Sequence, residues 1–251
     1  MSETTIAVSH KDRPVAFTQD QIGWTPWLVP LSEVQLTERH WAGLVDASRA
    51  KSPYFMLLAR DPKILEARTK TDNDIFYNAA AGLPRAEREL SAAAVSRANG
   101  CIFCASVHAR FASTYSKRRE DVQRLLDEGV SVGVDQRWNA VIAAAVALTE
   151  TPLAFDQRHV ESLRQSGLDD LAIADVIYSA AFFNWANRLM LSLGEPTPPA
   201  KGRTAPADRL ASRKDSGCDH AAQIGLAYAG ICAQNLGGSL QDDPAGLKDI
   251  A

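Results

Sequence analysis

Glu89, Cys101, Cys104 and His108 are the side chains whose types and spacing could support chemistry. On a helix that begins near Cys101, positions 101, 104 and 108 are related as i, i+3 and i+7, so both sulfurs and the imidazole share one face. Glu89 lies twelve residues before Cys101, in the preceding helical segment. If the two segments pack antiparallel, its carboxylate can point at the cysteine pair. These four groups form the candidate catalytic site.

The dipeptide Asn99-Gly100 predicts a helix break directly before Cys101. Cys101 would then begin the next helix, where unpaired amides and the positive end of the dipole favour a thiolate. Cβ atoms at i and i+3 of a helix are about 5–6 Å apart, whereas a disulfide needs roughly 3.5–4.5 Å. The pair can close only if the first turn deforms, so we expect Cys101 at the helix start.

Formation of a thiolate explains only a small part of the reactivity such a site would need. Lowering a thiol pKa from ~8.5 to ~7 increases the thiolate fraction about 16-fold at pH 7. The accompanying fall in nucleophilicity reduces this gain to roughly three- to fourfold. Proton delivery to a departing hydroxide or alkoxide is typically worth about 10²–10⁴. This comparison favours a carboxylate and an imidazole beside the sulfurs, and the sequence offers both.

Helical periodicity runs through most of the chain, and β-branched residues never alternate long enough to predict strands. The predicted fold class is therefore all-α. Helices are expected over 37–50, 61–81, 84–98, 101–115, 119–128, 135–150 and 168–193, with another that begins at position 156. Residues able to cap helix N-termini precede four of these segments: Thr37, Asp61, Asp135 and Asp156. The Trp residues at helical positions are expected in the core, and His40 and His159 at the surface.

Three regions can be distinguished along the chain. Residues 1–35 contain three prolines and no sustained period, which predicts an extended arm with Trp24, Trp27 and Leu28 packed on the body or on a neighbouring subunit. Residues 36–197 form the all-α domain. Residues 198–251 begin with a stretch rich in Pro, Lys, Arg, Ala and Ser, which predicts a linker and a poorly ordered tail.

Composition excludes several classes of partner. The chain has 27 Lys and Arg against 30 Asp and Glu, a net charge of −3, whereas nucleic acids and anionic membranes require a basic excess. No apolar run approaches the ~20 residues of a membrane span, and the N-terminus lacks the blocks of a signal peptide. We therefore expect a cytoplasmic protein. In that reducing compartment a C-x-x-C pair indicates redox or metal chemistry.

The stretch LPRAERELSAAAVSRANGCIFCASVHARFAS, residues 83–113, resembles the alkylhydroperoxidase D (AhpD) family within the carboxymuconolactone decarboxylase-like superfamily. The shared pattern is a carboxylate twelve residues before C-x-x-C and a His four residues after the second Cys. A second segment, residues 181–194, is similar to the peroxidase-related branch of that family. The resemblance covers roughly residues 36–197.

The resemblance implies a role for each of the four residues. Cys104 would be the peroxidatic thiol, which peroxide converts to a sulfenic acid, and Cys101 would resolve it as a disulfide. Glu89 and His108 would relay protons to and from the sulfurs. The best-known family member has a His between the cysteines, where this chain has Phe103. The family also implies a trimer or hexamer, a peroxide substrate and a dithiol donor protein, without a cofactor or bound metal.

Three other interpretations of the same residues remain open at this point. The cysteines could be two buried small hydrophobes. Together with His108 and Glu89 they could bind zinc and stabilise a helical binding module. The chain could also be a lactone decarboxylase of the same superfamily, although members with that chemistry do not need the dithiol. Asn184, Asn187 and Arg188, on a strongly apolar helix, are expected to cap a helix end or to form a subunit contact rather than to bind substrate.

Overall fold

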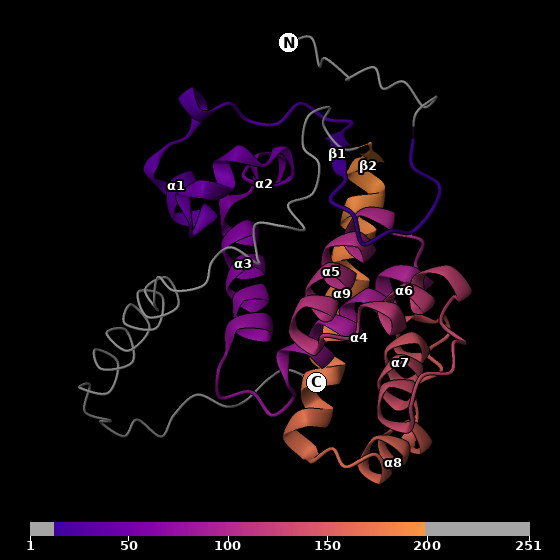
Figure 1. The fold of residues 1–251 in the computed structure, drawn as a ribbon. Coiled ribbons are helices and arrows are strands. Elements are labelled where there is room, and N and C mark those ends of the chain that lie inside the picture. The colour runs from indigo at the N-terminus through magenta and orange to yellow at the C-terminus, as the bar shows by residue number, and fades with distance from the viewer. Residues whose placement is uncertain (1–12, 199–251) are drawn as a thin grey trace, which may run out of the picture. The chain divides into compact units, whose positions relative to one another are not determined.

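The computed structural model describes residues 13–198. In this part of the chain there are nine α-helices and one two-stranded sheet (Figure 1), so the all-α fold class is confirmed. The helices are α1 (Glu38–Leu44), α2 (Pro53–Leu58), α3 (Pro62–Tyr77), α4 (Arg85–Ala98), α5 (Ile102–Ser116), α6 (Arg119–Glu128), α7 (Gln136–Thr149), α8 (Gln157–Gln165) and α9 (Asp170–Leu193). None of the helices in 13–198 is long and apolar enough to cross a membrane.

Helix α4 is the central element and packs against α5, α7 and α9. Ten of its 14 residues are buried, in one unbroken run. Ala92, Ala93 and Ala94 are completely buried, and their short side chains allow three neighbouring helices to approach closely. A helix enclosed on all sides also encloses its polar residues, and this placement buries Glu89.

Most predicted helix boundaries agree with the structure, and side-chain caps set the starts of α3, α7, α8 and α9. Asp61 accepts hydrogen bonds from the backbone NH groups of Lys63 and Ile64, and Asp135 accepts one from Trp138. The helix expected over 37–50 is wrong in its second half. Helix α1 ends at Leu44, and a 3₁₀ helix over Ala47–Lys51 follows, because Asp46 caps a new turn at Ser48.

Two further boundaries differ from the prediction. Ser52-Pro53 interrupts the helical segment, but it also begins α2. Proline suits the first helical position because its φ is already fixed near the helical value. Helix α3 ends at Tyr77 rather than near position 81. These differences fall in short segments whose sequence period is weak.

The described part of the N-terminal arm is attached to the end of α9. Strand β1 (Gly23–Pro26) pairs antiparallel with β2 (Gly194–Thr197), and no strand was expected in the sequence at either place. The Trp24 side chain is buried and its Nε1 donates to the Met190 carbonyl at 3.3 Å. A side chain at Gly194 would overlap the Trp24 ring, so this close approach requires glycine. The predicted tail, 198–251, lies outside the described residues apart from Pro198.

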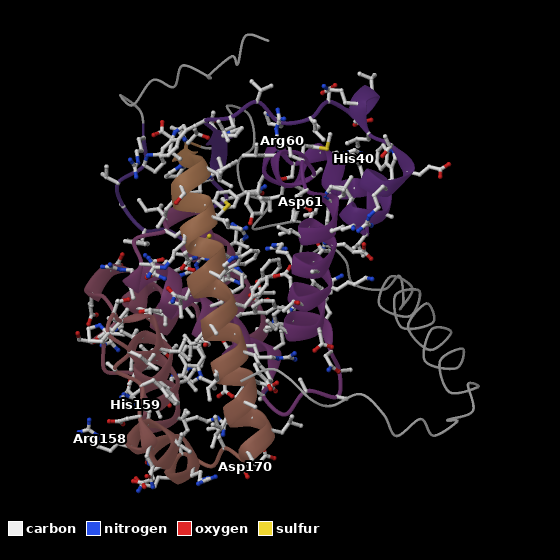
Figure 2. All side chains as sticks on the ribbon, turned by 180° about the vertical axis from the view of Figure 1, so that it is seen from behind. His40, Arg60, Asp61, Arg158, His159 and Asp170 are labelled. Atoms are coloured by element: carbon white, nitrogen blue, oxygen red, sulfur yellow. The ribbon has the colours of Figure 1, made fainter. Side chains whose placement is uncertain are left out.

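Two tryptophans expected in the core are at the surface. Trp138 is buried, but Trp41 and Trp185 are 37% and 40% exposed. The predictions for His40 and His159 are also wrong, since both are half-buried. Each of these rings accepts from a backbone NH at its own helix start, at 3.1 Å in both cases. Figure 2 shows the two residues far apart, with His40 near the top of the view and His159 near the bottom.

Candidate active site

Cys101 and Cys104 lie at the junction that the sequence indicates. Cys101 is the residue immediately before α5, with a backbone conformation outside the helical region, and Cys104 is in the first turn. The two Sγ atoms are 2.9 Å apart, within hydrogen-bonding distance for thiols, and both residues are free cysteines. Both side chains are almost fully buried. The non-helical Cys101 relaxes the i, i+3 spacing that would otherwise hold the sulfurs apart.

Glu89 and His108 form a buried pair between α4 and α5. Their Oε2 and Nδ1 atoms are 2.6 Å apart, and Glu89 is 1% exposed. Since an ionised carboxylate only accepts, Nδ1 carries the shared hydrogen and Nε2 is the ring nitrogen left to exchange protons. The rings of Phe183 and Phe76 pack on the imidazole, with centroids 3.9 and 5.2 Å from its own. The ring is therefore held in one orientation.

Arg85, one helical turn before Glu89, adds a cation to this pair. Arg85 Nε donates to Glu89 Oε1 at 3.1 Å, while the Arg85 guanidinium lies over the Tyr77 and Tyr115 rings at 4.1 and 4.4 Å. Glu89 thus bridges a guanidinium and an imidazole, and its buried charge is compensated.

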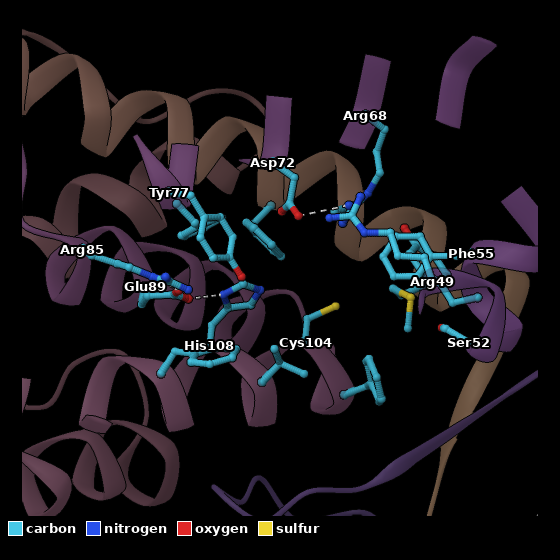
Figure 3. Close-up of a pocket in the computed structure, with 18 residues that line it drawn as sticks. Arg49, Ser52, Phe55, Arg68, Asp72, Tyr77, Arg85, Glu89, Cys104 and His108 are labelled. Atoms are coloured by element: carbon cyan, nitrogen blue, oxygen red, sulfur yellow. Dashed lines mark hydrogen bonds and ion pairs between the residues drawn. The ribbon is translucent and has the colours of Figure 1, made fainter. Parts of the chain in front are cut away.

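A cavity of about 330 Å³ gives three of the four predicted residues access to one space. Glu89, Cys104 and His108 all line it, and Figure 3 shows Cys104 between the His108 side and a group of arginines. Cys101 is not among the lining residues. A small molecule in the cavity would meet the Cys104 sulfur, with Cys101 beside it.

The environment of the two thiols shifts their pKa values in opposite directions. A hydrogen bond from Cys104 lowers the pKa of Cys101 against the opposing effect of burial. Burial, and then the neighbouring Cys101, raise the pKa of Cys104 well above its ordinary value, whereas Asn187 and Arg68 act to lower it. The first proton lost therefore leaves a Cys101 thiolate that accepts from the Cys104 thiol.

The polar residues of α9 contact the end of α4. Asn99, which ends α4, donates through Nδ2 to Asn184 Oδ1 at 3.1 Å and to Asn187 Oδ1 at 3.2 Å. Asn187 in turn donates to Ser96 Oγ at 3.0 Å. This contact agrees with the predicted contact to a helix end, and it places Asn187 behind the cysteine pair. Arg188 is exposed.

Sequence reasoning missed the arginines of the cavity. Arg49, Arg68 and Asp72 line it from outside the motif segment. Arg68 Nη1 donates to Asp72 Oδ2 at 3.2 Å, and the residue is only 8% exposed. Its position on the buried face of α3, three residues after Leu65, was an available signal, because an arginine in an apolar stripe must find partners inside the protein.

The zinc interpretation lacks a ligand set in residues 13–198, since no three Cys, His, Asp or Glu side chains there are arranged to hold a metal ion. Cys218, His220 and Cys232, whose spacing matches no specific metal-binding pattern, lie outside the described residues.

The chain is similar to known proteins in sequence and in fold. Residues 62–148 match the model of the carboxymuconolactone decarboxylase family. The fold matches the alkylhydroperoxidase AhpD core of a peroxidase-related protein from Ralstonia eutropha JMP134, with a TM-score of 0.56 and 21% identity over 69% of this chain and 90% of that one. The predicted resemblance to the AhpD and carboxymuconolactone decarboxylase superfamily is confirmed.

A debrominase also shares this fold. The debrominase Bmp8 matches with a TM-score of 0.54 and 17% identity, over 65% of this chain and 88% of that one. A cysteine-to-alanine variant of Bmp8 in complex with 2,3,4-tribromopyrrole matches with a TM-score of 0.54 and 16% identity, over 80% and 95% of the two chains. No protein of curated function matches the sequence.

Proposed function

We propose that the chain is a thiol-dependent peroxidase, or the dithiol reductase partner of one, that cycles Cys101 and Cys104 between dithiol and disulfide. The observation that carries this proposal is the 2.9 Å contact between the two sulfurs at the wall of a cavity that also exposes Glu89 and His108. A structural thiol pair would have no need of a buried carboxylate–imidazole pair facing the same space.

Once the pair has lost one proton the charge lies on Cys101, so the reaction of this form begins with a proton shift. The Cys104 proton moves to Cys101 across the 2.9 Å contact, and Arg68 and Asn187 favour the resulting Cys104 thiolate. That thiolate attacks the distal oxygen of the hydroperoxide and breaks the O–O bond. His108, held by Glu89, supplies a proton to the departing alkoxide. The products are a Cys104 sulfenic acid and an alcohol.

Resolution uses the cysteine already in contact. Cys101 gives its proton to the now neutral His108 and attacks the Cys104 sulfur. The S–OH bond breaks, and the departing hydroxide takes that proton from His108 and leaves as water. Two thiols and one hydroperoxide thus give a disulfide, an alcohol and water. A dithiol donor protein then reduces the disulfide. The proposed setting is a cytoplasmic homo-oligomer of three or six subunits that needs no cofactor.

A second candidate uses the same dithiol for reductive debromination. It is favoured by the fold shared with Bmp8, whose complex contains a brominated pyrrole. In that reaction a dithiol and an aryl bromide would give a disulfide, the debrominated ring and hydrogen bromide. A lactone decarboxylase, which would leave the thiols unchanged, is the third candidate.

Peptide mapping after exposure to cumene hydroperoxide tests the proposal. The wild type should form a Cys101–Cys104 disulfide with release of one cumyl alcohol per chain, and Cys101→Ser should stop at a sulfenic acid on Cys104. If both thiols remain reduced, the peroxidase proposal is wrong. Disulfide formed only with tribromopyrrole would favour the debrominase. Turnover of a carboxylated lactone by the Cys101→Ser/Cys104→Ser double variant would favour the decarboxylase.

A further inference from the structure

The cavity contains a second polar group that the proposed redox steps leave largely unused. Arg49, at the 3₁₀ helix after α1, donates to Asn73 Oδ1 at 3.0 Å, and Arg68 on α3 donates to Asp72. Figure 3 shows both guanidinium groups at one side of Cys104, away from the Glu89–His108 pair. Asp72 is the carboxylate that lines the cavity at this end.

The hydrogen-bonding capacity of these two arginines is incompletely used. Arg49 Nη1 and Arg68 Nε are buried and have no hydrogen-bond partner among the described residues. A buried donor without a partner is costly, and the cost is larger for a charged group. Among the residues that line this end of the cavity, Asp72 compensates one of the two positive charges and leaves an excess of one. Asp46, which also acts on Arg49, lies outside the cavity. At the other end Glu89 already compensates Arg85.

We propose that Arg49 and Arg68 bind the carboxylate of a small organic acid, which places the acid's reactive group at Cys104. An excess of a single positive charge matches a monoanion better than a phosphate, whose second charge Asp72 would repel. The volume of about 330 Å³ is at the lower end of the roughly 300–1,000 Å³ range of ligand pockets. The rings of Tyr54, Phe55 and Phe103 line the cavity and would cover an apolar body. Only the identity of the reactive group rests on the proposed function.

Arg68 has a second role that must be separated from binding. Its charge lowers the pKa of Cys104, so its removal would change thiol chemistry as well as ligand affinity. Arg49 is the more selective test, because the causes that shift the two thiol pKa values do not include it.

The test measures binding by calorimetry on the reduced protein with an unreactive probe, 4-isopropylbenzoate, and with its neutral analogue 4-isopropylbenzamide. Because neither probe can be reduced by a dithiol, the result does not depend on peroxidase activity. We expect the acid to bind at least about tenfold more tightly than the amide, since each hydrogen bond to a charged group contributes substantially. Arg49→Gln should lower the affinity for the acid about tenfold and leave the affinity for the amide within about twofold.

Arg39→Gln provides the matched control. It removes the same charge from a residue that is paired with Glu66 and does not line the cavity, so the preference for the acid should persist. Equal affinities for acid and amide, no binding of the acid, or a preference retained in Arg49→Gln would each overturn the proposal. A positive binding result combined with unreactive thiols would support the anion site and refute the peroxidase.

Discussion

Two glutamates on α4 show that position alone decides whether a buried carboxylate can take part in catalysis. Glu87 and Glu89 are both nearly buried and both paired with an arginine. Only Glu89 lines the cavity and contacts His108, whereas Glu87 forms a two-bonded ion pair with Arg137 at 2.6 and 2.8 Å. The relay can therefore be tested against an almost equivalent carboxylate two residues away.

We expect Glu89→Gln to slow peroxide-driven disulfide formation by at least about 10²-fold, the lower end of the contribution of general acid–base catalysis. Glutamine preserves the size and an acceptor for His108 Nδ1 but cannot stabilise the imidazolium. The rate is measured by stopped-flow fluorescence with cumene hydroperoxide. Glu87→Gln is the control and should lower stability without a comparable loss of rate. Similar rates for both variants would show that Glu89 has a structural role only.

The shared proton of the cysteine pair leads to a prediction about pH. The hydrogen bond from Cys104 stabilises the Cys101 thiolate and so lowers its pKa. Cys104→Ala removes this donor, and the pKa of Cys101 should rise above its ordinary value, because burial is then the largest remaining cause. Cys104→Ser keeps an O–H donor and should retain a lowered pKa. Ultraviolet absorbance at 240 nm, in a background with Cys218→Ser and Cys232→Ser, follows thiolate formation directly.

The sign of the pH effect on activity follows from the same contact. Below the first apparent pKa of the pair both sulfurs are protonated and no thiolate is available, so the reaction rate should rise with pH through this value. Equal first pKa values in the alanine and serine variants would contradict the shared proton.

At the scale of elements, the arrangement of the cysteine motif could be predicted from local sequence features. The Asn99-Gly100 break fixes where α4 ends and α5 begins, and this junction sets the positions of both sulfurs. The 3.6-residue period then places Cys104 and His108 on one face. Arg49 and Arg68 could not be assigned in the same way, because their relation to Cys104 depends on how α1–α3 pack against α5 and leaves no local pattern.

The break itself gives a prediction about stability. Gly100 has φ +76°, and nothing lies within 4 Å of the place that a Cβ would take. Gly100→Ala should therefore destabilise the fold through backbone strain alone, by about 1–2 kcal/mol. The free energy of unfolding in urea measures this change. Gly133→Ala, at another glycine with open space but without positive φ, is the control and should cost nothing. Equal destabilisation of both variants would refute the strain argument.

At the scale of the whole molecule, the outer face of α9 includes Trp185, which was expected in the core. The apolar stripe through Leu171 and Trp185 has the period of a core helix, yet it faces outward, and the buried face is formed by residues such as Val176, Ala180 and Phe183. A helix that is apolar on both sides has no sequence signal to distinguish the core from a second covered surface. This ambiguity is resolved only by packing.

The exposed face is where we expect subunits to meet. Leu171, Tyr178 and Trp185 are 53%, 61% and 40% exposed and are spaced seven residues apart, so they form one stripe along α9. Trp185→Glu should weaken self-association at least about thirtyfold, the effect of losing about 2 kcal/mol at an aromatic anchor. Sedimentation equilibrium measures the change. Leu153→Glu, at an exposed apolar residue between α7 and α8, is the control and should leave assembly unaltered. A monomeric wild type, or a Trp185→Glu variant that assembles normally, would show that this stripe is not the subunit contact.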